Sequence, residues 1–209
     1  MSGTMSQSDL ISDLKSMLGG TSDSFENDGR EDFERLLTTA AAALSRDKPQ
    51  KLTDTLSLVA EQPYYDAPAL IIKAINYDWG MQELKFRMPW QTNFPKQLPA
   101  IKLVKTATGK KVHLFPAPTA AQIADLGSSF VYYYTAQYVI DKQAINTTID
   151  EADRDLLLLR ALVVAMTELA MKSAATPVSL GPGKYGSSPK NGTPAALAES
   201  LLNQYMVML

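Results

Sequence analysis

The longest uninterrupted helical pattern in the chain spans residues 148–176, TIDEADRDLLLLRALVVAMTELAMKSAAT. Thr148 and Glu151 have the spacing of a capping box, and acidic residues in the first turns suit the positive end of a helix dipole. No Gly or Pro follows until Pro177. One side of this helix, about half of its circumference, is apolar and consists of Leu156, Leu158, Leu159, Leu162, Val163, Met166, Leu169 and Ala170. The pattern predicts a central helix on which the rest of the chain is organised.

A second, narrower apolar stripe runs through the polar side of this helix at heptad spacing: Leu157, Val164 and Met171. A helix in the outer layer of a monomer normally has one apolar stripe and one polar face. The second stripe fits a helix that is covered on both sides by its own chain. It also fits a helix that faces a copy of itself or another subunit, and on this interpretation Leu157, Val164 and Met171 form a subunit interface.

Two further helices are predicted before residue 49. The first spans residues 9–18, with Ser8 as its cap and Gly19-Gly20 at its end, and the second spans residues 30–47 and ends at Lys48-Pro49. We expect residues 32–44 to pack beside residues 148–174. Small residues allow a close approach of these two helices, namely Ala40 and Ala41 on one and Ala161 and Ala165 on the other.

Alternation of apolar and polar residues replaces the helical period after residue 49 and predicts strands. Residues 51–61 alternate, although Asp54 breaks the pattern. Residues 101–106 and 111–115, joined through Thr108-Gly109, predict a hairpin, and the Tyr- and Val-rich residues 128–140 predict a long strand. Residues 63–68 are predicted as a turn, residues 69–76 fit no element, and residues 77–99 are predicted as a long loop with both tryptophans.

The chain loosens after residue 176 into VSLGPGKYGSSPKNGTP, which is dense in Gly and Pro. Apolar residues then recur at helical spacing near the end: Leu197, Leu201, Leu202, Tyr205, Met206 and Leu209. We expect residues 177–209 to form a flexible arm whose apolar tip docks on another subunit. The predicted fold is α+β and mainly α. A domain of residues 1–176 combines a helical bundle, residues 8–48 and 148–176, with a β-rich insert, residues 50–141, that contains an antiparallel sheet.

The composition excludes several kinds of chemistry. The chain has no cysteine and one histidine, which leaves no zinc-thiolate site, no cysteine nucleophile and no paired-histidine site. The net charge of −2 differs from the basic balance of a dedicated DNA-binding protein. No run of about 18 apolar residues is present, and the first residues lack the regions of a signal peptide, so we expect synthesis in a cytoplasm.

The remaining candidate motifs have structural explanations. His113 lies on a predicted strand, on the face opposite Val112 and Leu114, and is expected to be structural. The acidic residues near position 150 are typical of a helix start without a metal. Residues 180–184, LGPGK, lack the second Gly-Lys-Ser/Thr of a phosphate-binding loop. The hairpin lysines are expected to protect a solvated sheet edge, and contact with nucleic acid is the alternative; they are Lys102, Lys105, Lys110 and Lys111. We therefore expect no enzyme activity and no cofactor.

The order of these elements resembles the head-to-tail adaptor (connector) proteins of tailed bacteriophages. The matching segments are DFERLLTTAAAALSRDK (residues 32–48), LSLVAEQPYYDAPALI (residues 56–71), KVHLFPAPT (residues 111–119) and residues 148–171. The resemblance covers roughly residues 8–175. It depends on the order and spacing of the segments, because the L-x-P-A-P and Y-x-x-P-A motifs are short. The long tryptophan-containing loop and the length of the tail depart from the family.

The resemblance implies a structural virion protein located at the head–tail junction and, during assembly, in the host cytoplasm. Such adaptors bind beneath the portal ring, form rings of about twelve subunits, extend the DNA channel and provide a platform for tail or stopper proteins. Their C-terminal arms often reach the portal, so the resemblance implies that the apolar tip of residues 177–209 docks on the portal or on an adjacent adaptor. DNA would pass through this channel without specific binding. Two alternatives remain: a head-completion stopper or tail-completion protein, and a DNA-binding module that uses the lysine hairpin.

Overall fold

The fold is α+β and mainly α in a computed structural model that describes residues 5–26, 30–92, 94–174 and 193–209. This confirms the predicted fold class. The chain forms two compact units. The bundle unit consists of Met1–Lys48 and Tyr138–Leu209, and the insert is Pro49–Gln137. The predicted insert, residues 50–141, ends slightly beyond the observed one.

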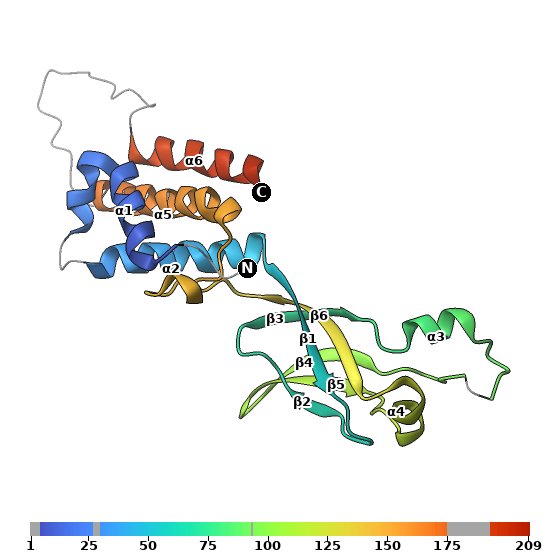
Figure 1. Cartoon of the computed structure of the whole chain (residues 1–209). Coiled ribbons are helices and arrows are strands. Elements are labelled where there is room, and N and C mark those ends of the chain that lie inside the picture. Colours follow the sequence, from blue (N-terminus) through green and yellow to red (C-terminus); the bar gives the residue numbers. More distant parts are fainter. Residues whose placement is uncertain (1–4, 27–29, 93, 175–192) are drawn as a thin grey trace, which may run out of the picture. The chain divides into compact units, whose positions relative to one another are not determined.

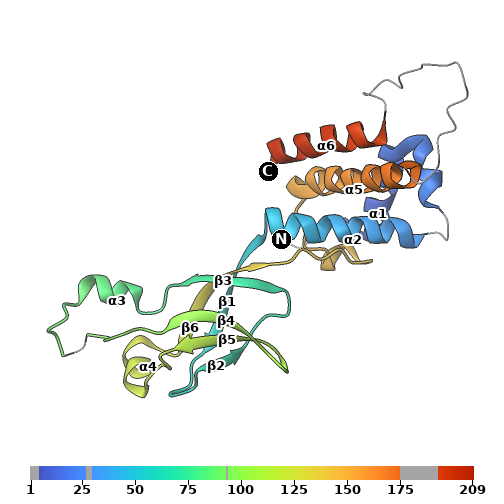
Figure 2. The ribbon, with the colours of Figure 1, turned by 180° about the vertical axis from the view of Figure 1, so that it is seen from behind.

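Four α-helices and three short 3₁₀ turns make up the described part of the bundle unit. They are α1 (Gln7–Leu18), η1 (Gly19–Phe25), α2 (Arg30–Asp47), η2 (Ala144–Asn146), η3 (Glu151–Asp153), α5 (Arg154–Ala174) and α6 (Pro194–Met208). The helix α5 lies between α2 and α6, and α1 packs across α2 and α5 (Figures 1 and 2). The predicted central position of this helix therefore holds within the bundle unit.

The helix starts differ from those predicted. Ser6, not Ser8, caps α1, in a capping box with Asp9. The capping box predicted for Thr148 and Glu151 is wrong: the Thr148 hydroxyl oxygen accepts a hydrogen bond from the Val139 amide at 2.9 Å. Thr148 therefore holds the chain that returns from the insert, and α5 begins at Arg154 after a 3₁₀ turn.

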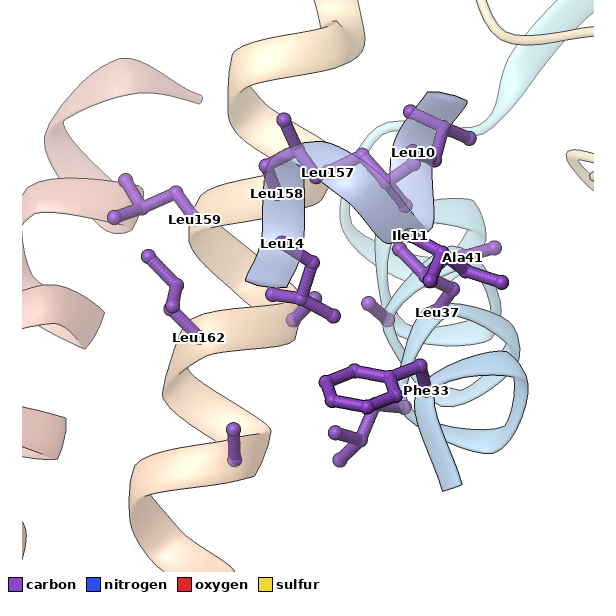
Figure 3. Packing of buried hydrophobic residues seen from close by; sticks show 14 of the residues in the cluster. Leu10, Ile11, Leu14, Phe33, Leu37, Ala41, Leu157, Leu158, Leu159 and Leu162 are labelled. Atoms are coloured by element: carbon purple, nitrogen blue, oxygen red, sulfur yellow. The ribbon is translucent and has the colours of Figure 1, made fainter. Parts of the chain in front are cut away.

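The core of the bundle is built on the face that α5 shares with α1 and α2. Leu157 of α5 lies near Leu10 of α1, whereas Leu159 and Leu162 point toward α6 (Figure 3). The small residues that were expected to permit close helix contact are buried: Ala40, Ala41, Ala161 and Ala165. The predicted side-by-side packing of α2 and α5 is confirmed. Arg35 and Glu168 join the same two helices through two hydrogen bonds of 2.6 and 2.8 Å.

Two three-stranded antiparallel sheets form the insert. The first has the strand order β1-β6-β3 and the second β2-β5-β4. The strands are β1 (Gln50–Ser57), β2 (Tyr64–Asp66), β3 (Ile71–Tyr77), β4 (Ala100–Thr106), β5 (Gly109–Phe115) and β6 (Ser129–Ala136). The predicted hairpin is observed as β4 and β5, and the long predicted strand is observed as the shorter β6.

Four elements of the insert were not predicted. The expected turn at residues 63–68 contains β2, and the unassigned residues 69–76 supply most of β3, which pairs with β6 through two register shifts. The helices α3 (Met81–Phe86) and α4 (Ala120–Leu126) were also missed. Each is only one to two turns long, too short to establish a helical period in the sequence.

Asp54, which breaks the alternation of β1, has a clear role. One of its carboxylate oxygens accepts the Thr55 amide at 2.8 Å, and the other accepts the hydroxyl of the fully buried Tyr132 at 3.1 Å. Burial, followed by the nearby Asp54 charge, raises the pKa of Tyr132. A charged side chain placed in this way on an edge strand disfavours strand addition by another chain.

Candidate interaction surfaces

The three residues predicted for a subunit interface occupy different environments. Leu157 is fully buried in the bundle core, and Val164 is partly buried and packs against that core. Met171, near the end of α5, is 68% exposed. The interface prediction is therefore wrong for Leu157, because α1 lies on the side of α5 that heptad spacing alone marked as a second face. Met171 stays available to a partner.

The segment predicted as a mobile tip is an ordered helix packed on α5. Thr193 caps α6 by accepting the Ala196 amide at 3.3 Å, and Pro194 occupies the first turn. Its predicted docking residue Tyr205 is fully buried, and its hydroxyl donates a hydrogen bond of 2.8 Å to Asp47. The docking prediction is therefore wrong for Tyr205, and residues 194–209 belong to the bundle unit. The rest of the predicted arm lies mainly outside the described residues.

Tyr205 anchors the C-terminal end of α6 against α2 and α5. The Arg160 guanidinium of α5 lies 5.1 Å from the centre of the Tyr205 ring. Burial, and then the hydrogen bond to Asp47, raises the pKa of Tyr205. Because Arg160 is near the start of α5 and Tyr205 near the end of α6, the two helices run antiparallel (Figure 1).

Apolar side chains remain exposed on both sides of this anchor. Leu202, Met206 and Leu209, which we call the α6 stripe, recur at helical spacing on one side and are 36%, 61% and 40% exposed. Leu197 and Met208 are exposed and Leu201 is partly buried on the other side. Five of the six residues predicted for docking therefore retain accessible surface. Exposed apolar residues that gather on one helix indicate an interaction site.

The end of α3 and the loop that follows it form a second exposed apolar surface. Phe86 and Trp90 are each 79% exposed and Met88 is 48% exposed. We call residues 86–92 the tryptophan loop. The other tryptophan, Trp79, is buried in the core of the insert and donates a hydrogen bond of 2.9 Å to the Gly127 carbonyl. No signal in the sequence separates these two tryptophans, since both lie among Gly and Pro residues.

Two of the four hairpin lysines are already engaged within the insert. Lys111 forms an ion pair of 2.8 Å with Asp66, and the Lys110 ammonium group donates to the Ile71 carbonyl. Lys102 and Lys105 are exposed. Two cations on one hairpin supply little of the charge with which a duplex-binding surface neutralises several phosphates. This arrangement weakens the nucleic-acid alternative.

The titratable groups are arranged for packing. His113 stacks on Tyr64 with ring centres 4.6 Å apart. The largely buried Asp153 binds the Lys48 ammonium group at 2.7 Å and accepts the Tyr138 hydroxyl at 3.1 Å. Among the described residues, no group of three His, Cys, Asp or Glu side chains is placed to hold a metal ion. The LGPGK segment, residues 180–184, lies outside the described residues.

The ion pair between α2 and α5 predicts a small pH dependence of stability. The hydrogen bonds that Glu168 accepts from Arg35 lower the pKa of Glu168 below its ordinary value of 4.5. A lowered folded-state pKa stabilises the fold above pH 4.5, and this contribution is lost as the pH falls through the lowered value. We expect Glu168→Gln to remove less than about 1 kcal/mol at pH 7, because the pair is partly exposed, and to flatten the acid limb of stability.

Urea unfolding at pH values between about 3 and 7 measures this effect, since the curve covers the range in which carboxylates titrate. The matched control is Glu199→Gln at an exposed position of α6, which should keep the wild-type pH dependence. An unchanged acid limb in Glu168→Gln would show that the pair does not contribute to stability.

The sequence matches no protein-family model and no curated protein. None of the described helices is long and apolar enough to cross a membrane.

Proposed function

We propose that this protein is a head-to-tail adaptor, a structural virion protein that binds the portal ring of a tailed bacteriophage, extends its DNA channel and receives the tail or a stopper protein. The basis is the order of sequence segments that resembles the adaptor family. The α+β fold with a helical bundle and an inserted antiparallel sheet agrees with this assignment.

The observation that carries the proposal is the apolar surface of α6. This helix is capped and anchored in the bundle, yet most of its large apolar side chains are exposed. Burying a side chain of this size stabilises a complex by roughly 1.5–3 kcal/mol relative to leaving it in water. An adaptor needs such surfaces for two partners, the portal and the neighbouring copies in the ring. The α6 surface therefore docks on one of these two.

The charge of the chain suits a protein that surrounds moving DNA. The formal net charge is −2. Each phosphate contact would add binding free energy and hold the DNA in place, so a channel is better built with few free cations. DNA accordingly passes through the ring without specific binding. A stopper or tail-completion protein would use the same surfaces and differs in the partner that it binds.

Electron microscopy of the purified protein, alone and mixed with its cognate portal, tests the proposal. We expect rings of about twelve subunits on the portal, as the resemblance to the adaptor family implies. Met206→Glu should strongly reduce the attachment of the protein to the portal. Gln204→Glu adds the same charge at an exposed polar position of α6 and should leave this attachment unchanged. A protein that stays monomeric and fails to bind portal would contradict an adaptor function.

A further inference from the structure

The tryptophan loop is held in a defined shape even though its aromatic side chains lie in solvent. The Met88 amide donates to the Gln91 side-chain oxygen at 3.0 Å, and the Gln91 amide donates to the Met88 carbonyl at 2.9 Å. The Arg87 guanidinium binds Asp125 of α4, which ties the start of the loop to the insert. A pre-ordered loop loses little conformational entropy on binding, so Phe86 and Trp90 are well suited to act as interface anchors.

The two units of the chain carry opposite net charge. The insert, Pro49–Gln137, contains nine Lys and Arg and six Asp and Glu. The bundle unit contains eleven Lys and Arg and sixteen Asp and Glu. Lys85 and Lys96, which flank the tryptophan loop in sequence, are both exposed. The insert of one copy is therefore electrostatically complementary to the bundle unit of another.

The α6 stripe offers a surface of matching chemistry on the bundle unit. Glu199 is exposed one helical turn before Leu202. At the other end of the stripe, the contact between Arg160 and Tyr205 brings the end of α6 beside the first turns of α5. The exposed Asp47 lies at this end as well, where its carboxylate accepts the Tyr205 hydroxyl at 2.8 Å. The apolar stripe thus has carboxylates near both ends, whereas the loop has lysines on both sides.

We propose that Phe86 and Trp90 of one copy pack on the α6 stripe of the next copy, Leu202, Met206 and Leu209, with Lys85 and Lys96 facing the carboxylates around it. Two different surfaces meet in such a heterologous contact. A row of linked copies therefore has a free tryptophan loop at one end and a free α6 stripe at the other. Such contacts close into a ring where the rotation from one copy to the next completes a full turn without displacement along the axis, and otherwise they build an open filament. The closed ring rests on the proposed adaptor function, whereas the pairwise contact does not. The α6 stripe is assigned to the neighbouring copy and not to the portal.

A mixing experiment with two complementary variants tests this contact. The loop variant, Phe86→Ser with Trp90→Ser, keeps an intact stripe, and the stripe variant, Leu202→Asp with Met206→Asp, keeps an intact loop. Each variant alone should self-associate at least about tenfold more weakly than the wild type, because hot-spot residues are lost. An equimolar mixture should form a one-to-one dimer, since only one intact contact remains possible. Analytical ultracentrifugation at low salt measures both results.

Controls separate a lost contact from a lost fold. All four substituted side chains are exposed, so circular dichroism and the melting temperature should match those of the wild type. Val59→Ser with Ile75→Ser, also exposed in the insert but outside the tryptophan loop, is the matched control and should assemble more strongly than the loop variant. In addition, Lys85→Glu should weaken assembly, and Glu199→Lys in the partner copy should restore part of it.

The outcomes distinguish this contact from the adaptor function. A mixture that stays monomeric, or a wild-type protein that stays monomeric at low salt and high concentration, overturns the proposed contact. If the stripe variant still assembles with itself but no longer binds portal rings in electron microscopy, the stripe belongs to the portal, and the adaptor proposal stands. If the mixture forms the dimer but the wild type never binds portal, the contact stands and the adaptor proposal fails.

Discussion

We expect Tyr205→Ala to lower the free energy of unfolding of the bundle unit by about 3–5 kcal/mol, the loss typical of a fully buried aromatic side chain. Tyr205 has no exposed surface, although it lies four residues before Leu209 on a helix whose other large side chains are partly or largely exposed. The substitution removes the ring from the core, its contact with Arg160 and its hydrogen bond to Asp47. Urea unfolding monitored by circular dichroism measures this loss.

Two control variants divide the effect of Tyr205 into its parts. Tyr205→Phe keeps the ring and removes only the hydrogen bond to the exposed Asp47, which should cost about 1 kcal/mol. Met206→Ala, at the neighbouring exposed position, should stay within about 0.5 kcal/mol of the wild type. If Tyr205→Ala were as stable as Met206→Ala, α6 would not be part of the bundle core in the free protein.

Leu157→Ala should destabilise the bundle by about 2–5 kcal/mol, because it opens a cavity among α1, α2 and α5. Leu157 is fully buried in the same cluster as Leu10 and Leu14. Met171→Ala, on the same heptad stripe but 68% exposed, should change stability by less than about 0.5 kcal/mol. Thermal and urea unfolding of the two variants, measured side by side, give the comparison.

Measurements of self-association should show the larger effect at Met171, the position whose substitution changes stability less. If Met171 contributes to a subunit contact, Met171→Asp should weaken assembly and leave the monomer folded, since a charge would be buried only in the complex. A small loss of stability in Leu157→Ala, below about 1 kcal/mol, would be inconsistent with its burial in the monomer core.

Local periodicity determined most of the regular elements. The helical spacing in residues 30–47 and 148–176, together with Pro49 and Pro177 beyond their ends, was enough to predict α2 and α5, although α5 begins only at Arg154. The alternation around Thr108-Gly109 was enough for the β4–β5 hairpin. These predictions succeed because a helix or a hairpin of this length carries its hydrogen bonds and its turn chemistry within one short segment.

Only the tertiary structure decided which apolar residues are free to bind a partner. Leu157 and Met171 share one stripe in the sequence, but α1 covers the first and leaves the second in solvent. Tyr205 and Met206 are adjacent, yet one is an anchor in the core and the other is exposed. Burial depends on which distant segment lies above a residue, and a single periodic pattern contains no record of that segment.

The same distinction between local spacing and long-range packing applies to the candidate contact surfaces. The apolar, helical spacing of residues 197–209 was visible in the sequence, but its ordered packing on α5 depends on Asp47 and Arg160, which are distant in the chain. Trp79 and Trp90 were equivalent in the sequence. The Gly127 carbonyl and the core of the insert receive Trp79, whereas Trp90 lies in the tryptophan loop and is 79% exposed. Local spacing therefore determines the element, and long-range packing determines which of its faces is left to bind.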